Sequence, residues 1–144
     1  MRWATLVMLT LLATGPACND LRDFRGTWQG PRVGEAEVLR VGAGESATLS
    51  IDEIDSHGIQ GHLAIPGLVP DAALVPVPGA EADALANMTF SGGPLRVYLA
   101  FVPMPDGGGD ALVLVALFDD ARVELRVLRS GTQPVYAIFA MTST

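Results

Sequence analysis

Two histidines, His57 and His62, are the first candidates for a general base or a metal ligand in this sequence, because a neutral imidazole can serve as either. They lie five residues apart around the turn at residues 55–58. Three acidic residues beside them could complete a zinc or calcium site: Asp52, Glu53 and Asp55. Zinc requires convergent side chains, and calcium requires a loop with regularly spaced oxygens and a positioned glycine. The acidic run lacks that spacing, so we interpret His57 as a turn residue and His62 as a solvent-facing strand residue.

The rest of the sequence offers no set of residues for a familiar type of catalysis. Asp106 and Asp110 bracket three glycines, which could hold an ion but more often form a solvated loop. No serine lies in a Gly-x-Ser-x-Gly turn, and the 16 acidic residues give no assignable pair for glycosidic cleavage. All 9 basic residues are arginines, and the lack of lysine excludes Walker A phosphate binding and Schiff-base chemistry. We therefore expect no enzymatic activity, no bound metal and no cofactor.

The charge balance argues against nucleic acid as a partner. The formal net charge at pH 7 is −7. Binding to a phosphate backbone depends on a cationic patch that releases counterions, and an acidic chain without lysine is poorly suited to it. The 144 residues suffice for one domain whose core needs no disulfide or metal.

The single cysteine, Cys18, carries the most information about location. Arg2 precedes an apolar run at residues 3–13, which is too short to span a bilayer but fits the core of a signal peptide. The following Thr-Gly-Pro-Ala-Cys, residues 14–18, resembles the cleavage site of bacterial lipoproteins.

This resemblance implies that residues 1–17 are a signal peptide, that Cys18 carries a lipid and that residues 18–23 form a tether. The membrane would then be a partner, because the lipid holds the protein to it. The expected location is the periplasmic face of the cell envelope, specifically the outer membrane. The alternative is an ordinary secreted, soluble protein that is cut after Ala17 and keeps Cys18 as a free thiol.

Alternation of apolar and polar residues predicts strands in the rest of the chain. The clearest strand has Val123, Leu125 and Val127 alternating with charged residues, and the turn at residues 119–120 folds it back on the apolar run 111–118. A second hairpin joins residues 49–52 to 59–65. Prolines make residues 66–86 an edge strand or a long loop, in which residues 81–86 could add one helical turn. Further strands are predicted at residues 24–30, 37–41, 87–91, 95–102 and 135–141, of which the last is apolar on both faces.

About 8–10 short strands separated by turn residues predict a single all-β domain over residues 24–144. An antiparallel up-and-down β-barrel is favoured over a β-sandwich, because closing the sheet removes exposed edges. A signal-peptide helix is expected to precede it.

The residues Gly26, Thr27 and Trp28, followed by Gly30, resemble the Gly-x-Trp start of lipocalin-like barrels. In that family the tryptophan plugs the closed end of the barrel, and an arginine from a late strand packs over it. The resemblance therefore implies a barrel floor made by Trp28 with Arg126 or Arg129.

Two functions remain open from the sequence. In the first, the barrel is a binding module that holds an apolar small molecule in its interior or under the proline-rich residues 66–86. In the second, it is a structural or interaction protein that docks an envelope protein and fills its interior with its own side chains. A barrel of eight strands lies near the boundary between these two cases. The candidates for such a filled core are Leu112, Leu114, Leu117, Phe118, Val135 and Ile138.

Overall fold

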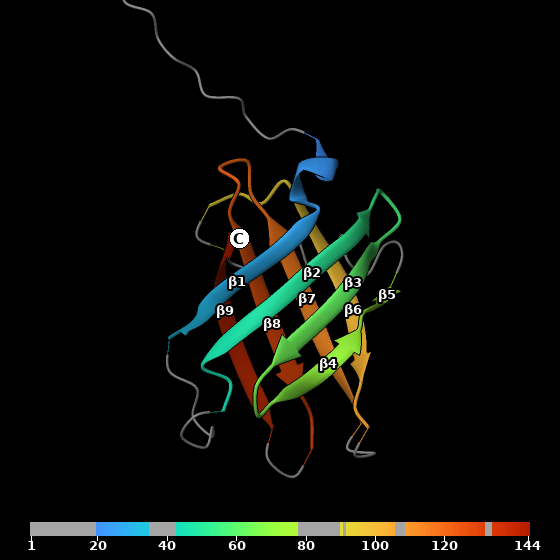
Figure 1. Cartoon of the computed structure of the whole chain (residues 1–144), viewed down its shortest axis with the longest axis vertical. Coiled ribbons are helices and arrows are strands. Elements are labelled where there is room, and N and C mark those ends of the chain that lie inside the picture. Colours follow the sequence, from blue (N-terminus) through green and yellow to red (C-terminus); the bar gives the residue numbers. More distant parts are fainter. Residues whose placement is uncertain (1–19, 35–42, 78–89, 91, 106–108, 132–133) are drawn as a thin grey trace, which may run out of the picture.

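The computed structural model describes residues 20–34, 43–77, 90, 92–105, 109–131 and 134–144. In these ranges the chain forms antiparallel strands in one nearly closed, barrel-shaped sheet (Figure 1). This confirms the predicted all-β fold. The predicted signal-peptide helix, the strand at 37–41 and the helical turn at 81–86 lie outside the described residues, as does the predicted strand at 87–91 apart from Phe90.

Within the described ranges, nine strands follow one short 3-10 helix. The elements are η1 (Leu21–Phe24), β1 (Gly26–Val33), β2 (Ser46–Ile54), β3 (Ile59–Ile65), β4 (Val69–Ala73), β5 (Val75–Val77), β6 (Arg96–Pro103), β7 (Asp110–Leu117), β8 (Val123–Arg129) and β9 (Val135–Ser143). Their order in the sheet is β4-β3-β2-β1-β9-β8-β7-β6-β5. Strands that follow one another in the chain are therefore neighbours in the sheet, apart from β4 and β5, and the first strand pairs with the last.

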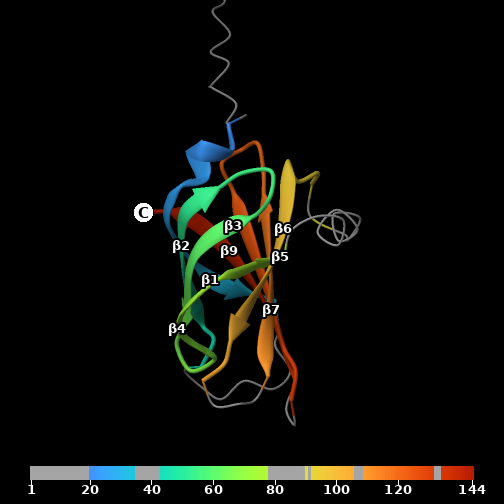
Figure 2. The same ribbon diagram turned by 90° about the vertical axis from the view of Figure 1, so that its right-hand side faces the viewer.

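The two edge strands, β4 and β5, are separated by one residue, Leu74. Since β4 pairs with β3 and β5 pairs with β6, one continuous segment supplies both edges of the sheet (Figure 2). The side chain of Leu74 is buried, and its backbone N–H donates to the carbonyl oxygen of Gly61 at 2.8 Å. The segment therefore turns a corner at Leu74, and this corner brings the sheet close to closure. The edge-strand prediction is confirmed for the described part of the proline-rich segment.

Apolar side chains from the inner faces of the strands fill the barrel. In β2, β3 and β8 nearly every second residue is buried, as the two-residue period of a strand requires. The largest of these fully buried side chains are Leu49, Ile51, Ile59, Leu63, Ile65, Leu117, Leu125, Phe139 and Met141, and Phe24 of η1 joins them.

A second, smaller apolar cluster lies on the outer face of β6 and β7. It contains Val97, Leu99, Leu114, Ala116 and Phe118, with Phe90 and Leu112 packed against it. The predicted core residues therefore divide into two groups. Leu117 and Val135 lie in the barrel interior, but the prediction was wrong for Leu112, Leu114, Phe118 and Ile138.

The reason lies in the composition of β7, which is apolar on both faces. Its own pattern therefore cannot indicate which side faces inward. The register with β8 decides, because Leu114 lies opposite Arg126 whereas Val115 lies opposite Leu125, and opposite residues share a face. The outer face of β7 is thus the one that carries Leu112 and Leu114.

Candidate functional site

β1 begins next to η1 at one end of the barrel (Figure 1), and Trp28 is the third residue of this strand. Its side chain is only 3% exposed and stacks on Phe24, with ring centroids 5.9 Å apart and an interplanar angle of 23°. The indole N–H donates to the carbonyl oxygen of Phe24 at 2.9 Å. Asp20 caps η1 by accepting from the backbone N–H of Arg22 at 2.9 Å. Trp28 therefore anchors the 3-10 helix at this end of the barrel.

The two late arginines do not join Trp28, so the predicted tryptophan–arginine floor is not formed. Arg126 lies on the outer face of β8, where its Nε donates to Glu124 Oε1 at 2.6 Å and its guanidinium lies 4.3 Å from the ring centroid of Phe90. Burial lowers the pKa of Arg126, but the bond and charge of Glu124 outweigh it, so that the pKa is raised overall. Arg129 ends β8 beside Val135, at the end of the barrel opposite Trp28.

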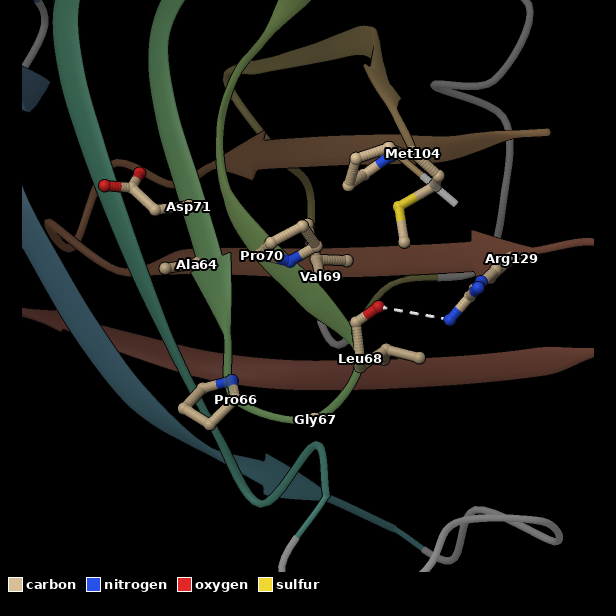
Figure 3. Close-up of a pocket in the computed structure, with 10 residues that line it drawn as sticks. Ala64, Pro66, Gly67, Leu68, Val69, Pro70, Asp71, Met104 and Arg129 are labelled. Atoms are coloured by element: carbon tan, nitrogen blue, oxygen red, sulfur yellow. Dashed lines mark hydrogen bonds between the residues drawn. The ribbon is translucent and has the colours of Figure 1, made fainter. Parts of the chain in front are cut away.

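A hollow of about 480 Å³ lies at this opposite end, where β3 turns into β4. Figure 3 shows Leu68, Met104 and Arg129 gathered on one side of it, with the Arg129 Nη1 donating to the carbonyl oxygen of Leu68 at 3.4 Å. The lining is mostly apolar, and a guanidinium and a carboxylate lie at its edge. It consists of Ala64, Pro66, Gly67, Leu68, Val69, Pro70, Asp71, Met104, Pro105 and Arg129.

A tight turn at residues 66–68 builds the wall of this hollow. The N–H of Leu68 donates to the carbonyl oxygen of Ile65 at 2.9 Å, and the carbonyl oxygen of Pro66 accepts from the N–H of Gly44 at 2.8 Å. Gly67 has a φ of +77°, a conformation that glycine adopts without steric cost. The sequence pointed to this segment through its prolines. The contributions of Met104 and Pro105 were missed, because they follow β6, far away in the sequence, and reach the hollow only through the folding of the sheet.

The two histidines lie apart and exposed. His57 is in the turn between β2 and β3, and His62 lies on β3 with its Nδ1 3.7 Å from Asp71 Oδ1. Asp55 organises the turn, because its carboxylate accepts from the backbone N–H groups of His57 at 2.7 Å and Gly58 at 3.1 Å. The His57 bond is the main reason why the pKa of Asp55 is lowered. In the described ranges no group of three or more His, Cys, Asp or Glu is placed to hold a metal ion.

Two candidates from the sequence, Cys18 and Asp106, lie outside the described residues. Among the residues that the structure does describe, no helix is long and apolar enough to cross a bilayer.

The geometry defines the class of the protein as an antiparallel β-barrel with a filled interior and an apolar hollow at one end. No protein-family model, no curated protein and no solved structure matches the chain.

Proposed function

We propose that this protein is an exported, lipid-anchored β-barrel that binds an apolar small molecule in the hollow beneath residues 66–71. The observation that carries the proposal is the hollow itself. Its volume of about 480 Å³ lies within the usual size of ligand pockets, which is about 300–1,000 Å³. Its walls are formed by side chains such as Leu68, Val69 and Met104. These favour an apolar occupant, because contact between two apolar surfaces removes both from water.

Because the interior is filled with side chains, we place the ligand at the mouth of the barrel. Many inward-facing side chains would have to move before a ligand could enter the centre, and close-packed cores resist such changes. The hollow, by contrast, exists without rearrangement, and Arg129 at its edge could orient a polar end of the ligand.

Ligand binding is expected to depend on the free volume beside Ala64. This half-buried residue lines the hollow, and Ala64→Trp places an indole in the space that the ligand would occupy. We expect the wild-type protein to enhance the fluorescence of Nile red, and Ala64→Trp to reduce the enhancement to near background. Native purification followed by mass spectrometry of the extracted small molecules would identify the natural ligand.

Ala73→Trp provides the matched control, since Ala73 is an exposed strand residue on neighbouring β4 that does not line the hollow. It should leave the Nile red signal unchanged. Equal signals from the wild type and Ala64→Trp would exclude the hollow as the binding site.

The proposed anchor rests on the signal-like residues 1–17 and on Cys18 as the only cysteine in the chain. In cells fed with radioactive palmitate, the wild-type chain is expected to become labelled and Cys18→Ser to remain at background, because the thiol that accepts the lipid is gone. Immunoblotting controls for the amount of protein. Equal labelling of the two chains would rule out the lipid anchor and leave the secreted alternative.

A structural or interaction protein of the cell envelope is the second candidate. The filled interior favours it, because such a barrel needs no cavity to present a face to a partner. Absence of any Nile red signal and of any extracted molecule would favour this candidate over ligand binding.

A further inference from the structure

The outer face of the barrel differs between its two halves. On β1 to β4 the outward side chains are mostly polar, among them Thr27, Gln29, Thr48, Ser50, Gln60 and His62. On β5 to β9 they are mostly apolar. Figure 2 shows β2 to β4 and β6 to β7 on opposite sides of the molecule, so the polar and apolar faces point in different directions.

One row of apolar side chains crosses all five strands of the apolar half. The pairing runs from Val75 to Phe101, from Phe101 to Leu112, from Leu112 to Leu128 and from Leu128 to Tyr136. We call these five residues the apolar row. Directly paired residues lie on the same face, so the row is continuous. Val75 is 48% exposed, Phe101 37%, Leu128 43% and Tyr136 46%, and Leu112 is half-buried.

The exposed area of the row is large for a surface that meets only water. With about 200 Å² for each large apolar side chain, the exposed fractions leave on the order of 400 Å² of apolar surface. Patches of about 300–600 Å² are the largest on typical monomers and are often functional. The flanking residues Val33 and Ile138 extend the row, and the total is then on the order of 500 Å², still within this range.

The charges around the row favour a partner with the same surface. The neighbouring outer residues of β8, Arg126 and Glu124, form an ion pair whose side chains are only 11% and 15% exposed. Their charges cancel, so this part of the face is close to neutral although the chain carries a net charge of −7. A second copy can therefore approach through this face with little of the like-charge repulsion that other faces would cause.

We propose that a second copy of this chain covers the apolar row, so that the protein is a dimer in which two barrels pack sheet on sheet. A two-fold axis near Leu112, the middle residue of the row, would place each row against its copy. Such an interface is self-complementary, as the common two-fold dimers require, and it buries apolar side chains in the manner of packed sheets. The ligand hollow is not needed for this contact.

Sedimentation velocity of the full chain tests the dimer, with every protein carrying Cys18→Ser to exclude acylation and disulfide exchange. We expect twice the chain mass for this parent protein. Leu128→Glu introduces a charge into the exposed row and should raise the dissociation constant about 30-fold or more, as loss of a central contact does. Phe101→Thr, which shortens a row residue without adding charge, should weaken the dimer in the same direction.

Gln60→Glu is the matched control, because it adds the same charge at an exposed strand position on the polar half; it should sediment like the parent. Circular dichroism checks that each variant folds. A monomeric parent protein would overturn the proposal in favour of another occupant of the row. A dimer that persists in Leu128→Glu and Phe101→Thr, or one that Gln60→Glu disrupts equally, would also overturn it.

Discussion

Replacing Trp28 with alanine is expected to lower the free energy of unfolding by about 3–5 kcal/mol, the usual cost of removing a buried aromatic side chain. Trp28 is almost fully buried and belongs to the main core. The substitution also removes the stacking on Phe24 and leaves the Phe24 carbonyl oxygen without its indole donor. Since these contacts connect η1 to the barrel, the 3-10 helix should lose its anchor.

Urea unfolding followed by circular dichroism measures this loss without relying on tryptophan fluorescence. Trp28→Phe is the informative companion, because it keeps an aromatic ring but not the N–H. Its expected cost is about 1–3 kcal/mol, the range for an unsatisfied buried acceptor with a small loss of volume. If Trp28→Ala cost no more than Trp28→Phe, the packing of the indole would not be the main stabilising contribution.

Replacing Gly30 with alanine is expected to disrupt the seam that joins β1 to β9. A Cβ atom at this position would overlap the carbonyl oxygen of Ala140 and lie 2.9 Å from the Cα of Met141. Both are backbone atoms, so relief requires one strand to move away from the other. Overpacking typically costs about 1–3 kcal/mol and occasionally more, and we expect the upper end because no flexible side chain can give way.

Thermal unfolding should show this as a Tm lowered by at least about 10 °C, given a shift of roughly 4 °C per kcal/mol in a domain of this size. Gly93→Ala is the matched control, because a Cβ there would meet no atom within 4 Å; its Tm should stay near that of the wild type. A normal Tm for Gly30→Ala would mean that β1 and β9 are not packed as closely as described.

Strands with a clear alternation were predictable from the sequence. Val123, Leu125 and Val127 alternate with charged residues, and β8 places them all in the interior. The same argument predicts the hairpin of β2 and β3. For these strands one orientation in the sheet has a much lower free energy than the other, because the opposite orientation would bury charged side chains and expose apolar ones.

The faces of β7 and the surroundings of the late arginines were not predictable in this way. Leu112 to Leu117 are apolar on both faces of the strand, so only the register with β8 decides which side is inside. Arg126 lies between Leu125 and Val127, which are both buried in the interior, so the alternation of the strand turns it outward to Glu124. A family pattern of tryptophan and late arginine cannot override the burial of these two neighbours.

The hollow was predictable only in part. The prolines at 66 and 70 pointed to the segment that forms its wall, because they interrupt the hydrogen bonding of a central strand. Met104 follows β6 and Arg129 ends β8, far away in the sequence, and their position depends on how the sheet closes at Leu74. Local patterns carry no information about such a long-range arrangement.

The two short edge strands that meet at Leu74 also affect how readily the protein could form amyloid. Fibrils grow when a foreign strand extends an exposed sheet edge, and short, proline-containing edges oppose this. Here β4 has five residues with Pro70, and β5 has three with Pro76. Each therefore offers an incoming strand few backbone donors, which disfavours polymerisation by strand addition.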